Sequence, residues 1–291
     1  MSLGDRQRWA RAGRGYTLVE LMVTMTILSV VLGAVYYSFF RAQSSARQTT
    51  RVVDARQGSR AALQLLEREV RMVGSGWGRI PIYGAQNGAP MTLHAVEPGF
   101  TTAAGNDSLE LLGGWDAGTT LRSPMFTSTS GSVIPCVSTA GFGSGDFVLV
   151  TNGSTAHIFQ VTAVSGTPAD LDHAASSIYN TAGGHMNWPA GGYPAGSRVY
   201  RVSWVTYKVD STGFRTPCLT RRDQGSAAQV VATDVSAFHV WYLLQDATET
   251  RDPVDLSLID KIRPVIQTQV ADRGSAVLTD SVWTMVRPRT F

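Results

Sequence analysis

Three residues close to the N-terminus, Gly15, Tyr16 and Glu20, have the types and spacing for chemistry between charged groups. Glu20 directly precedes residues 21–40, which include no Asp, Glu, Lys or Arg. A carboxylate at the edge of hydrocarbon costs at least about 2.5 kcal/mol unless a cation pairs with it. Glu20 is therefore a candidate for such a pair, although its side chain could instead extend into the headgroup layer. A peptidase that cleaves after Gly15 would provide the cation, because Tyr16 would then carry the new terminal amine.

The uncharged run 21–40 must position these residues, and its length suits a membrane. At 1.5 Å per residue it forms a helix of about 30 Å, the thickness of bilayer hydrocarbon. Gly15 precedes this run, whereas the cleavage site of a secretory leader follows it, so cleavage here leaves the helix on the mature chain. A basic flank favours a cytoplasmic N-terminus. The charged residues of that flank are Asp5, Arg6, Arg8, Arg11 and Arg14.

The string Gly-Tyr-Thr-Leu-Val-Glu-Leu at residues 15–21, after a short basic leader, resembles the class III signal of type IV pilins and of type II secretion pseudopilins. The resemblance implies that a prepilin peptidase in the inner membrane cleaves between Gly15 and Tyr16 and methylates the amine of Tyr16. It also implies that Glu20 is the carboxylate used in assembly. The run lacks the proline that many major pilins carry, so we expect no proline break in this helix.

We expect the helix to continue as an amphipathic second half, residues 41–73. Glu67 and Arg71 have the i,i+4 spacing of an ion pair, and Gly74 and Gly76 predict the end of the helix. An apolar stripe at steps of four, four and three residues is predicted to pack on a sheet. The stripe consists of Ala62, Leu66, Val70 and Val73.

The remaining residues, 74–291, are rich in Gly, Ser, Thr and Pro between short β-type runs, which predicts antiparallel strands joined by loops. The expected fold is therefore α+β and type IV pilin-like: a cleaved leader (1–15), a transmembrane and assembly helix (16–40), its amphipathic half (41–73) and a β-rich periplasmic or extracellular domain. The predicted strands are Ser108–Leu112, Asp146–Thr151, Ile158–Val164, Val199–Lys208, Val235–Leu244 and Ser281–Arg287, and the predicted long loops are Tyr83–Asn106, Thr127–Gly145 and Pro168–Gly196.

Several strings in the second part of the chain resemble the PilW group of minor pilins. They lie at residues 61–74, 106–111, 145–150 with 159–162, and 235–242. The resemblance implies a minor pilin that joins other minor pilins and the major pilin in a priming or tip complex, with a large PilY-type adhesin as a further partner. Such a subunit resides in the inner membrane before assembly and in the extracellular pilus afterwards, where it supports adhesion or twitching motility. A minor pseudopilin of a type II secretion system shares the same N-terminal features and remains the alternative.

The charge balance gives little support to nucleic-acid binding. The whole chain is formally +3, and the first fifteen residues, with four Arg and one Asp, contribute all of it. The side chains of the mature protein therefore sum to about zero. A further alternative is a pilus-tip subunit that contacts DNA or a glycan through Arg221 and Arg222, but two adjacent arginines are more typical of a solvated surface.

The sequence indicates no enzyme. Asp170, Asp172 and His173 could suggest a metal, but they lack companions at a recognisable spacing, so solvated loop residues are the preferred interpretation. The glycine-rich stretch 141–146 lacks the Gly-Lys-Ser/Thr end of a phosphate loop and predicts a turn before a strand. We expect no catalytic residue, cofactor or metal.

Cys136 and Cys218 are the only cysteines of the chain. The expected orientation places both on the oxidising side of the membrane, where disulfides form. We therefore expect a disulfide between them, closing a loop that the chain-entropy account values at up to about 4 to 5 kcal/mol. Two unrelated thiols are the alternative.

Overall fold

The structure is a computed structural model that describes residues 16–101, 105–114, 118–129, 131–271 and 277–289. The chain divides into two compact units, Met1–Arg51 and Val52–Phe291. One helix, α1 (Leu18–Met72), contributes to both of them. It is followed by a sheet-rich region, so the expected α+β class is confirmed. The helix ends where the glycines predict, because Gly74 has a φ of +70° that other residues rarely adopt.

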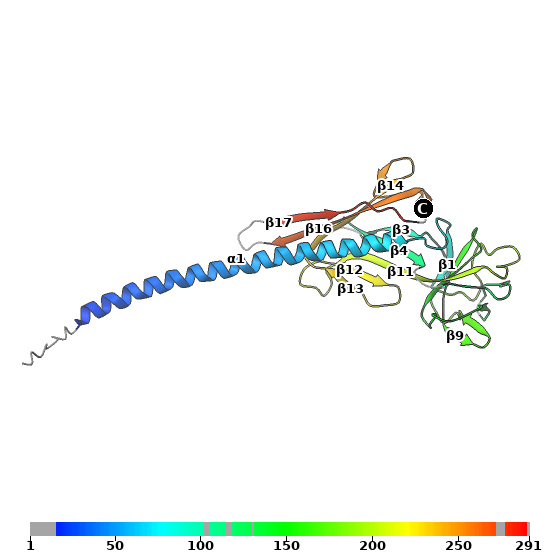
Figure 1. Ribbon diagram of the computed structural model, residues 1–291, viewed down its shortest axis with the longest axis horizontal. Helices are drawn as coiled ribbons and strands as arrows, with labels where there is room; N and C mark the ends of the chain where they lie inside the picture. The colour runs from blue at the N-terminus through cyan, green and yellow to red at the C-terminus, as the bar shows by residue number, and fades with distance from the viewer. Residues whose placement is uncertain (1–15, 102–104, 115–117, 130, 272–276, 290–291) are drawn as a thin grey trace, which may run out of the picture. The chain divides into compact units, whose positions relative to one another are not determined.

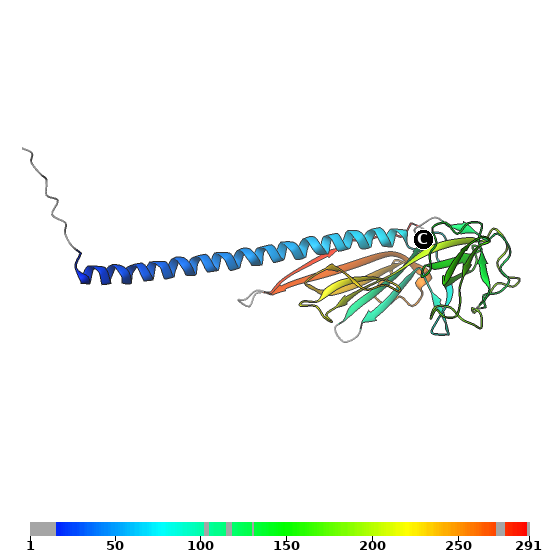
Figure 2. The ribbon, with the colours of Figure 1, turned by 90° about the horizontal axis from the view of Figure 1, so that it is seen from below.

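The second unit joins the last part of α1 to three sheets (Figures 1 and 2). The largest has ten strands, with the path β13-β12-β11-β7-β8-β1-β2, and β3, β4 and β5 pair beside it. A second sheet has the order β6-β10-β9 and a third the order β15-β14-β16-β17. The strands are β1 Ile82–Gln86, β2 Ala89–Leu93, β3 Val96–Thr101, β4 Asn106–Gly114, β5 Thr119–Thr120, β6 Val133–Pro135, β7 Phe147–Thr151, β8 Ala156–Gln160, β9 Ala163–Gly166, β10 Ala169–Asp172, β11 Arg198–Asp210, β12 Cys218–Asp223, β13 Gln229–Ala232, β14 Val235–Leu244, β15 Glu249–Thr250, β16 Ile259–Ala271 and β17 Val277–Trp283, with a 3-10 turn at Leu256–Leu258.

The apolar stripe of α1 packs as predicted. All four of its residues are buried in one core with side chains of β4, β11, β14 and β16. Leu66 is fully buried, and it shares this core with Leu111, Val205 and Ile262. At about 25 cal/mol per Å² of apolar surface, burial of such a side chain contributes roughly 2 to 3 kcal/mol. This stripe is therefore what attaches the helix to the sheets within the second unit.

Each predicted strand overlaps an observed one, but the predictions are wrong in several places. The predicted strand Ile158–Val164 is split between β8 and β9, and Ser281–Arg287 overlaps β17 only as far as Trp283. The predicted loops Thr127–Gly145 and Pro168–Gly196 contain β6 and β10, and β12 and β13 were not predicted. The predicted loop Tyr83–Asn106 contains β1, β2 and β3 instead. The thirteen-residue β16 was not predicted at all, and it lies between β14 and β17. Pairing is antiparallel as expected, except that β1 pairs with β8 in parallel.

The long connection after β10 is not an idle surface loop but part of a core. Tyr193 is fully buried, and its hydroxyl lies 2.7 Å from Nδ1 of His157. The other ring nitrogen of His157 lies 2.9 Å from the carbonyl oxygen of Met186. Trp188 donates from its indole N–H to the carbonyl of Phe126 at 3.0 Å. The connection is therefore fixed on β8 by specific polar contacts.

Two further histidines of this region are buried beside Phe159. The rings of His173 and His185 each lie 4.6 Å from the ring of Phe159, centroid to centroid. The side chain of His173 also contacts Ser132, with Nε2 at 3.1 Å from the hydroxyl oxygen. Burial lowers the pKa of both histidines to about 4. Both rings are therefore neutral in the folded protein near pH 7.

A buried carboxylate ties α1 to the largest sheet. Glu69 is 4% exposed and accepts hydrogen bonds from the Tyr207 hydroxyl at 2.5 Å and from Nε of Arg221 at 2.8 Å. Arg221 also forms an ion pair with Asp223 at 2.7 Å. Two positions earlier, Glu67 pairs with Arg71 at 2.6 Å on the partly exposed surface, as the sequence predicts.

These two glutamates give a matched pair of variants. Glu69→Gln is expected to lower the free energy of unfolding by about 2 kcal/mol, because hydrogen bonds to a charged group are lost in a buried place. Glu67→Gln is expected to lower it by less than about 0.5 kcal/mol, since exposed helix pairs contribute little. Urea unfolding of the full chain in a non-ionic detergent measures both values. Equal losses of unfolding free energy for the two variants would contradict the conclusion that the buried contacts of Glu69 contribute more than the exposed pair of Glu67.

The predicted disulfide is wrong, because the structure contains Cys136 and Cys218 as two buried free thiols. Cys136 forms an isolated antiparallel backbone pair with Leu121. The amide of Leu121 in turn donates to the carbonyl of Ser197, the residue just before β11. Cys218 pairs with Asp210 at the other end of β11. Twelve residue steps of about 3.3 Å along β11 separate its two ends by about 40 Å, whereas a disulfide needs Cα atoms about 6 Å apart.

We expect both thiols to remain free in the folded protein. Burial raises the pKa of the Cys136 thiol to about 12, which suppresses the reactive thiolate. Alkylation under denaturing, non-reducing conditions should therefore add two labels per chain by mass spectrometry, and native alkylation should add fewer. A chain that takes up no label and has a mass lower by two hydrogens would show that the two cysteines form a disulfide.

Candidate functional site

The N-terminus of α1 is closed by a reciprocal pair of contacts between Thr17 and Glu20. The Thr17 carbonyl accepts the first helical hydrogen bond, from the amide of Leu21 at 3.2 Å. The Thr17 hydroxyl oxygen accepts from the Glu20 amide at 3.2 Å, and Oε2 of Glu20 accepts from the Thr17 amide at 2.9 Å and from its hydroxyl at 3.1 Å. This arrangement is a capping box, which satisfies helix-end donors in both directions.

The capping box leaves half of the carboxylate available. Both contacts that reach the Glu20 carboxylate use Oε2, and Oε1 has no hydrogen-bond partner among residues 16–101. Tyr16, directly before the cap, is 86% exposed. Gly15 and the leader lie outside the described residues. The structure thus presents a fixed carboxylate with one open oxygen at the start of an apolar helix.

Thr17 is a functional residue that the sequence analysis missed. The signal was present, because a Ser or Thr three positions before a Glu, ahead of an apolar run, is the sequence pattern of a capping box. The structure shows that Glu20 caps its own helix through Oε2, and this contribution must be separated from any role of the open Oε1.

Thr17→Ala separates them by removing the hydroxyl while keeping the carboxylate. Loss of such a cap costs about 1 kcal/mol of helix stability. We expect the Glu20 amide, which bonds the Thr17 hydroxyl, to exchange its hydrogen about fivefold faster in detergent micelles. Amide exchange followed by mass spectrometry or NMR measures this rate. An unchanged rate at Glu20 would contradict the role of the hydroxyl.

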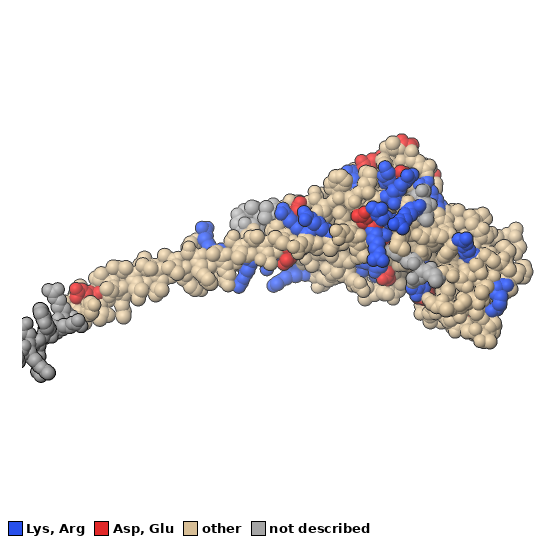
Figure 3. All heavy atoms as spheres, in the orientation of Figure 1, with Lys and Arg blue, Asp and Glu red and all other residues tan. Residues whose placement is uncertain are grey.

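The helix that carries this site has an apolar surface with nothing packed on it. Every described residue from 16 to 40 is exposed, and most are large hydrophobic side chains. In Figure 3 this segment shows almost only uncharged side chains. Among the described residues α1 is long and apolar enough to cross a membrane. Such a continuous apolar surface requires lipid or neighbouring helices around it.

Three of the hydroxyls within the span are satisfied inside the helix itself. Thr24 donates to the carbonyl of Glu20 at 2.8 Å, Thr26 to that of Met22 at 2.8 Å and Ser29 to that of Thr26 at 2.8 Å. These donors need no water, because each is satisfied by the helix's own backbone. At the far end Arg41 lies over the ring of Tyr37 at 5.6 Å, a combination typical of a membrane–water interface.

The structure does not bring the other candidate residues, those considered for a metal or for DNA and glycan binding, together in a site. Asp170 forms an ion pair with Arg122 at 3.0 Å, and His173 is buried against Phe159. Within the described part of the chain no group of three or more His, Cys, Asp or Glu side chains is arranged to hold a metal. Arg221 pairs with Glu69 and Asp223 inside the protein, so it is not available to a nucleic acid or glycan.

Comparison with known proteins agrees with the geometry at the N-terminus. A family described as the prokaryotic N-terminal methylation motif matches residues 11–36. The matched stretch contains the Gly15–Tyr16 junction, the capping box and most of the apolar span. No curated protein and no solved structure matches the chain.

Proposed function

We propose that this type IV prepilin-like protein is a minor pilin of the PilW kind, a structural subunit of the complex that starts assembly of a type IV pilus. The observation that carries the proposal is the open Oε1 of Glu20 at the start of an apolar helix whose residues 16–40 are all exposed, within the matched motif. A fixed charge at the end of an apolar rod suits assembly rather than catalysis, since its partner must come from another molecule.

In the proposed mechanism the helix is held in the inner membrane until an assembly machine extracts it. After cleavage at Gly15, the methylated amine of Tyr16 is a cation at the end of each neighbouring subunit. Glu20 accepts that cation on Oε1 while Oε2 stays in its own capping box. Because both charges are otherwise uncompensated among apolar helices, only a neighbour in the correct axial register is accepted.

The proposed partners follow from this mechanism. A prepilin peptidase removes the leader, other minor pilins and the major pilin surround the helix, and a PilY-type adhesin is a further partner at the tip. The β-rich unit lies in the periplasm before assembly and outside the cell afterwards. Adhesion or twitching motility is the cellular outcome.

Co-purification tests the proposal most directly. The chain is crosslinked in cells, purified, and its partners are identified by mass spectrometry, in parallel with a deletion strain scored for piliated motility and for release of secreted proteins. Pilins among the partners and lost motility support the proposal. Secretion-system components and lost protein release would assign the chain to a type II pseudopilus instead.

A further inference from the structure

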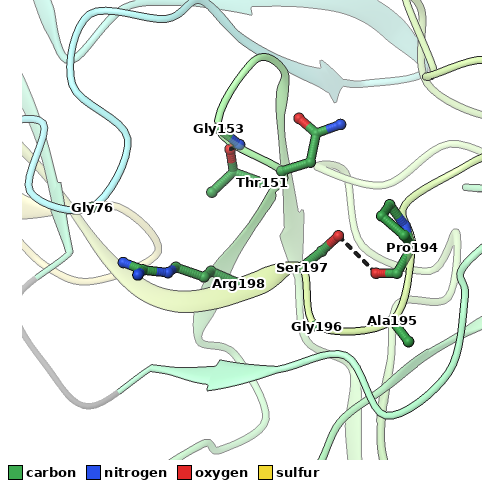
Figure 4. A pocket seen from close by; sticks show the side chains of 9 residues that line it. Gly76, Thr151, Gly153, Pro194, Ala195, Gly196, Ser197 and Arg198 are labelled. Atoms are coloured by element: carbon green, nitrogen blue, oxygen red, sulfur yellow. Dashed lines mark hydrogen bonds between the residues drawn. The ribbon is translucent and has the colours of Figure 1, made fainter.

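A cavity of about 420 Å³, with both polar and apolar lining, opens where β7 ends and β11 begins (Figure 4). Its wall is formed by residues 151–153, residues 194–198 and Gly76. The register brings the two strands together here, because Arg198 is the cross-strand partner of Thr151. The volume lies in the range of about 300 to 1,000 Å³ that small-molecule sites occupy. This cavity has no part in the N-terminal site.

Asn152 presents a fixed and unused donor at this cavity. Its Oδ1 accepts from the amides of Ser154 and Thr155, each at 3.0 Å, and from their hydroxyls at 2.9 and 3.1 Å. The two amides can only donate, so they identify the oxygen and fix the orientation of the side chain. The Nδ2 group, with two N–H donors, makes no hydrogen bond to any described residue.

Arg198 provides the positive charge at this cavity. It has no carboxylate partner among the described residues, and none of the residues lining the cavity is acidic. Its Nη1 donates to the Tyr200 hydroxyl at 3.0 Å, which restricts the guanidinium. The ring of Tyr200 packs closely on Gly76, since a Cβ at that position would lie 2.7 Å from the ring, and Gly76 has a φ of +101°. Glycine at position 76 therefore permits the close packing that holds the tyrosine beneath Arg198.

We propose that this cavity binds a carboxylate-bearing saccharide. Arg198 binds the carboxylate through charge-assisted hydrogen bonds, and the Asn152 amide donates to a ring hydroxyl. Pro194 and Ala195 add apolar surface for the CH groups of a sugar ring, which a bare inorganic anion would leave unused. The ligand class follows from the lining, which combines unused donors and one cation with apolar carbon and no acidic side chain.

Titration calorimetry of the full chain in a non-ionic detergent tests this site with glucuronate, glucose and acetate. We expect glucuronate to bind about tenfold or more tighter than either of the others, because only it satisfies both donors. Added NaCl should weaken this binding. Equal affinity for glucose and glucuronate, equal affinity for acetate and glucuronate, or no binding of glucuronate would overturn the proposal.

Three variants test whether glucuronate binds at this cavity. Arg198→Gln should weaken glucuronate about tenfold or more. Asn152→Asp should do the same, because aspartate keeps the acceptor oxygen for the turn and replaces the donor by a negative charge. Arg222→Gln, an equal change of charge at an exposed arginine outside the cavity, should leave the affinity unchanged. An Arg198→Gln variant that unfolds at the wild-type temperature and binds glucuronate as well as wild type would refute the site.

Discussion

The Glu20→Gln variant is expected to reach the membrane and to be processed like wild type, yet to fall on the order of a hundredfold in sheared pili. Glutamine preserves the capping box, because it can accept the same contacts from Thr17. It removes the charge that Oε1 offers to a neighbouring amine. An ion pair that loses one partner in an apolar place costs about 3 to 5 kcal/mol, and each 1.4 kcal/mol is about a factor of ten in occupancy.

Immunoblots of membrane and sheared-pilus fractions measure this effect, with the leader cleavage read from the mobility of the band. Thr17→Ala is the matched control, since it disturbs the cap by about 1 kcal/mol and keeps the carboxylate. We expect Thr17→Ala to lose only a few-fold in pili. If Glu20→Gln were recovered in pili as well as Thr17→Ala, the capping role alone would explain Glu20.

Acid is expected to destabilise the second unit strongly between pH 6.5 and about 4. Burial lowers the pKa of His173 and of His185 from 6.5 to about 4, while both rings titrate normally once the chain unfolds. Above pH 6.5 these two histidines therefore do not lower the free energy of unfolding. As the pH falls towards 4 they lower it increasingly, because the unfolded chain binds protons that the buried rings of the folded chain do not. At about 1.4 kcal/mol per pKa unit, the loss is roughly 3 kcal/mol for each histidine.

Urea unfolding of the full chain at pH 7, 5.5 and 4.5 measures this loss. His185→Gln should flatten the dependence on pH, whatever its effect on stability at pH 7. His94→Gln is the control, because the His94 side chain is 30% exposed beside Glu97 and lies outside the histidine cluster. Stability that stays constant from pH 7 to 4.5 would show that these rings are not neutral inside the fold.

The helix could be predicted from the sequence because its signals are local. The apolar run, the stripe through Leu66 and Val70, the Glu67–Arg71 spacing and the closing glycines all depend on neighbours within one or two turns. The same holds for β14, whose predicted bounds Val235–Leu244 agree with the structure. The capping box was also readable, since Thr17 and Glu20 are three positions apart.

The strands that were not predicted fall into two kinds. The hairpin of β1 and β2 turns at Asn87 and Gly88, both with positive φ, and Asn-Gly is the strongest short hairpin signal, so this hairpin was predictable from the local sequence. In β16, Pro264 argues against a central strand. It lies opposite Val240, whose amide donates to Asp107 at 2.8 Å, and one residue outside the pairing of β16 with β17, which begins at Val265. The position of that pairing is set by residues far away in the chain.

The cysteines and the cavity depend on topology, which spacing does not encode. Cys136 and Cys218 were paired because no other cysteines exist, but the register of β11 places them at its opposite ends. The same register brings Arg198 beside Thr151, the residue before Asn152. No sequence motif predicts that these residues meet. Pairing of distant strands, rather than composition, decides where these side chains meet.

The hydroxyls of Thr24, Thr26 and Ser29 have a consequence for how α1 can change surroundings. Each already bonds a carbonyl of its own helix, so moving this segment from lipid into a bundle of other helices breaks none of these bonds. Exchange between two apolar solvents is then nearly free of enthalpic cost along the helix side. Residues 21–40 can therefore be surrounded by lipid or by other apolar helices without losing these three hydrogen bonds, so the proposed transfer from membrane to pilus depends on the charge of Glu20.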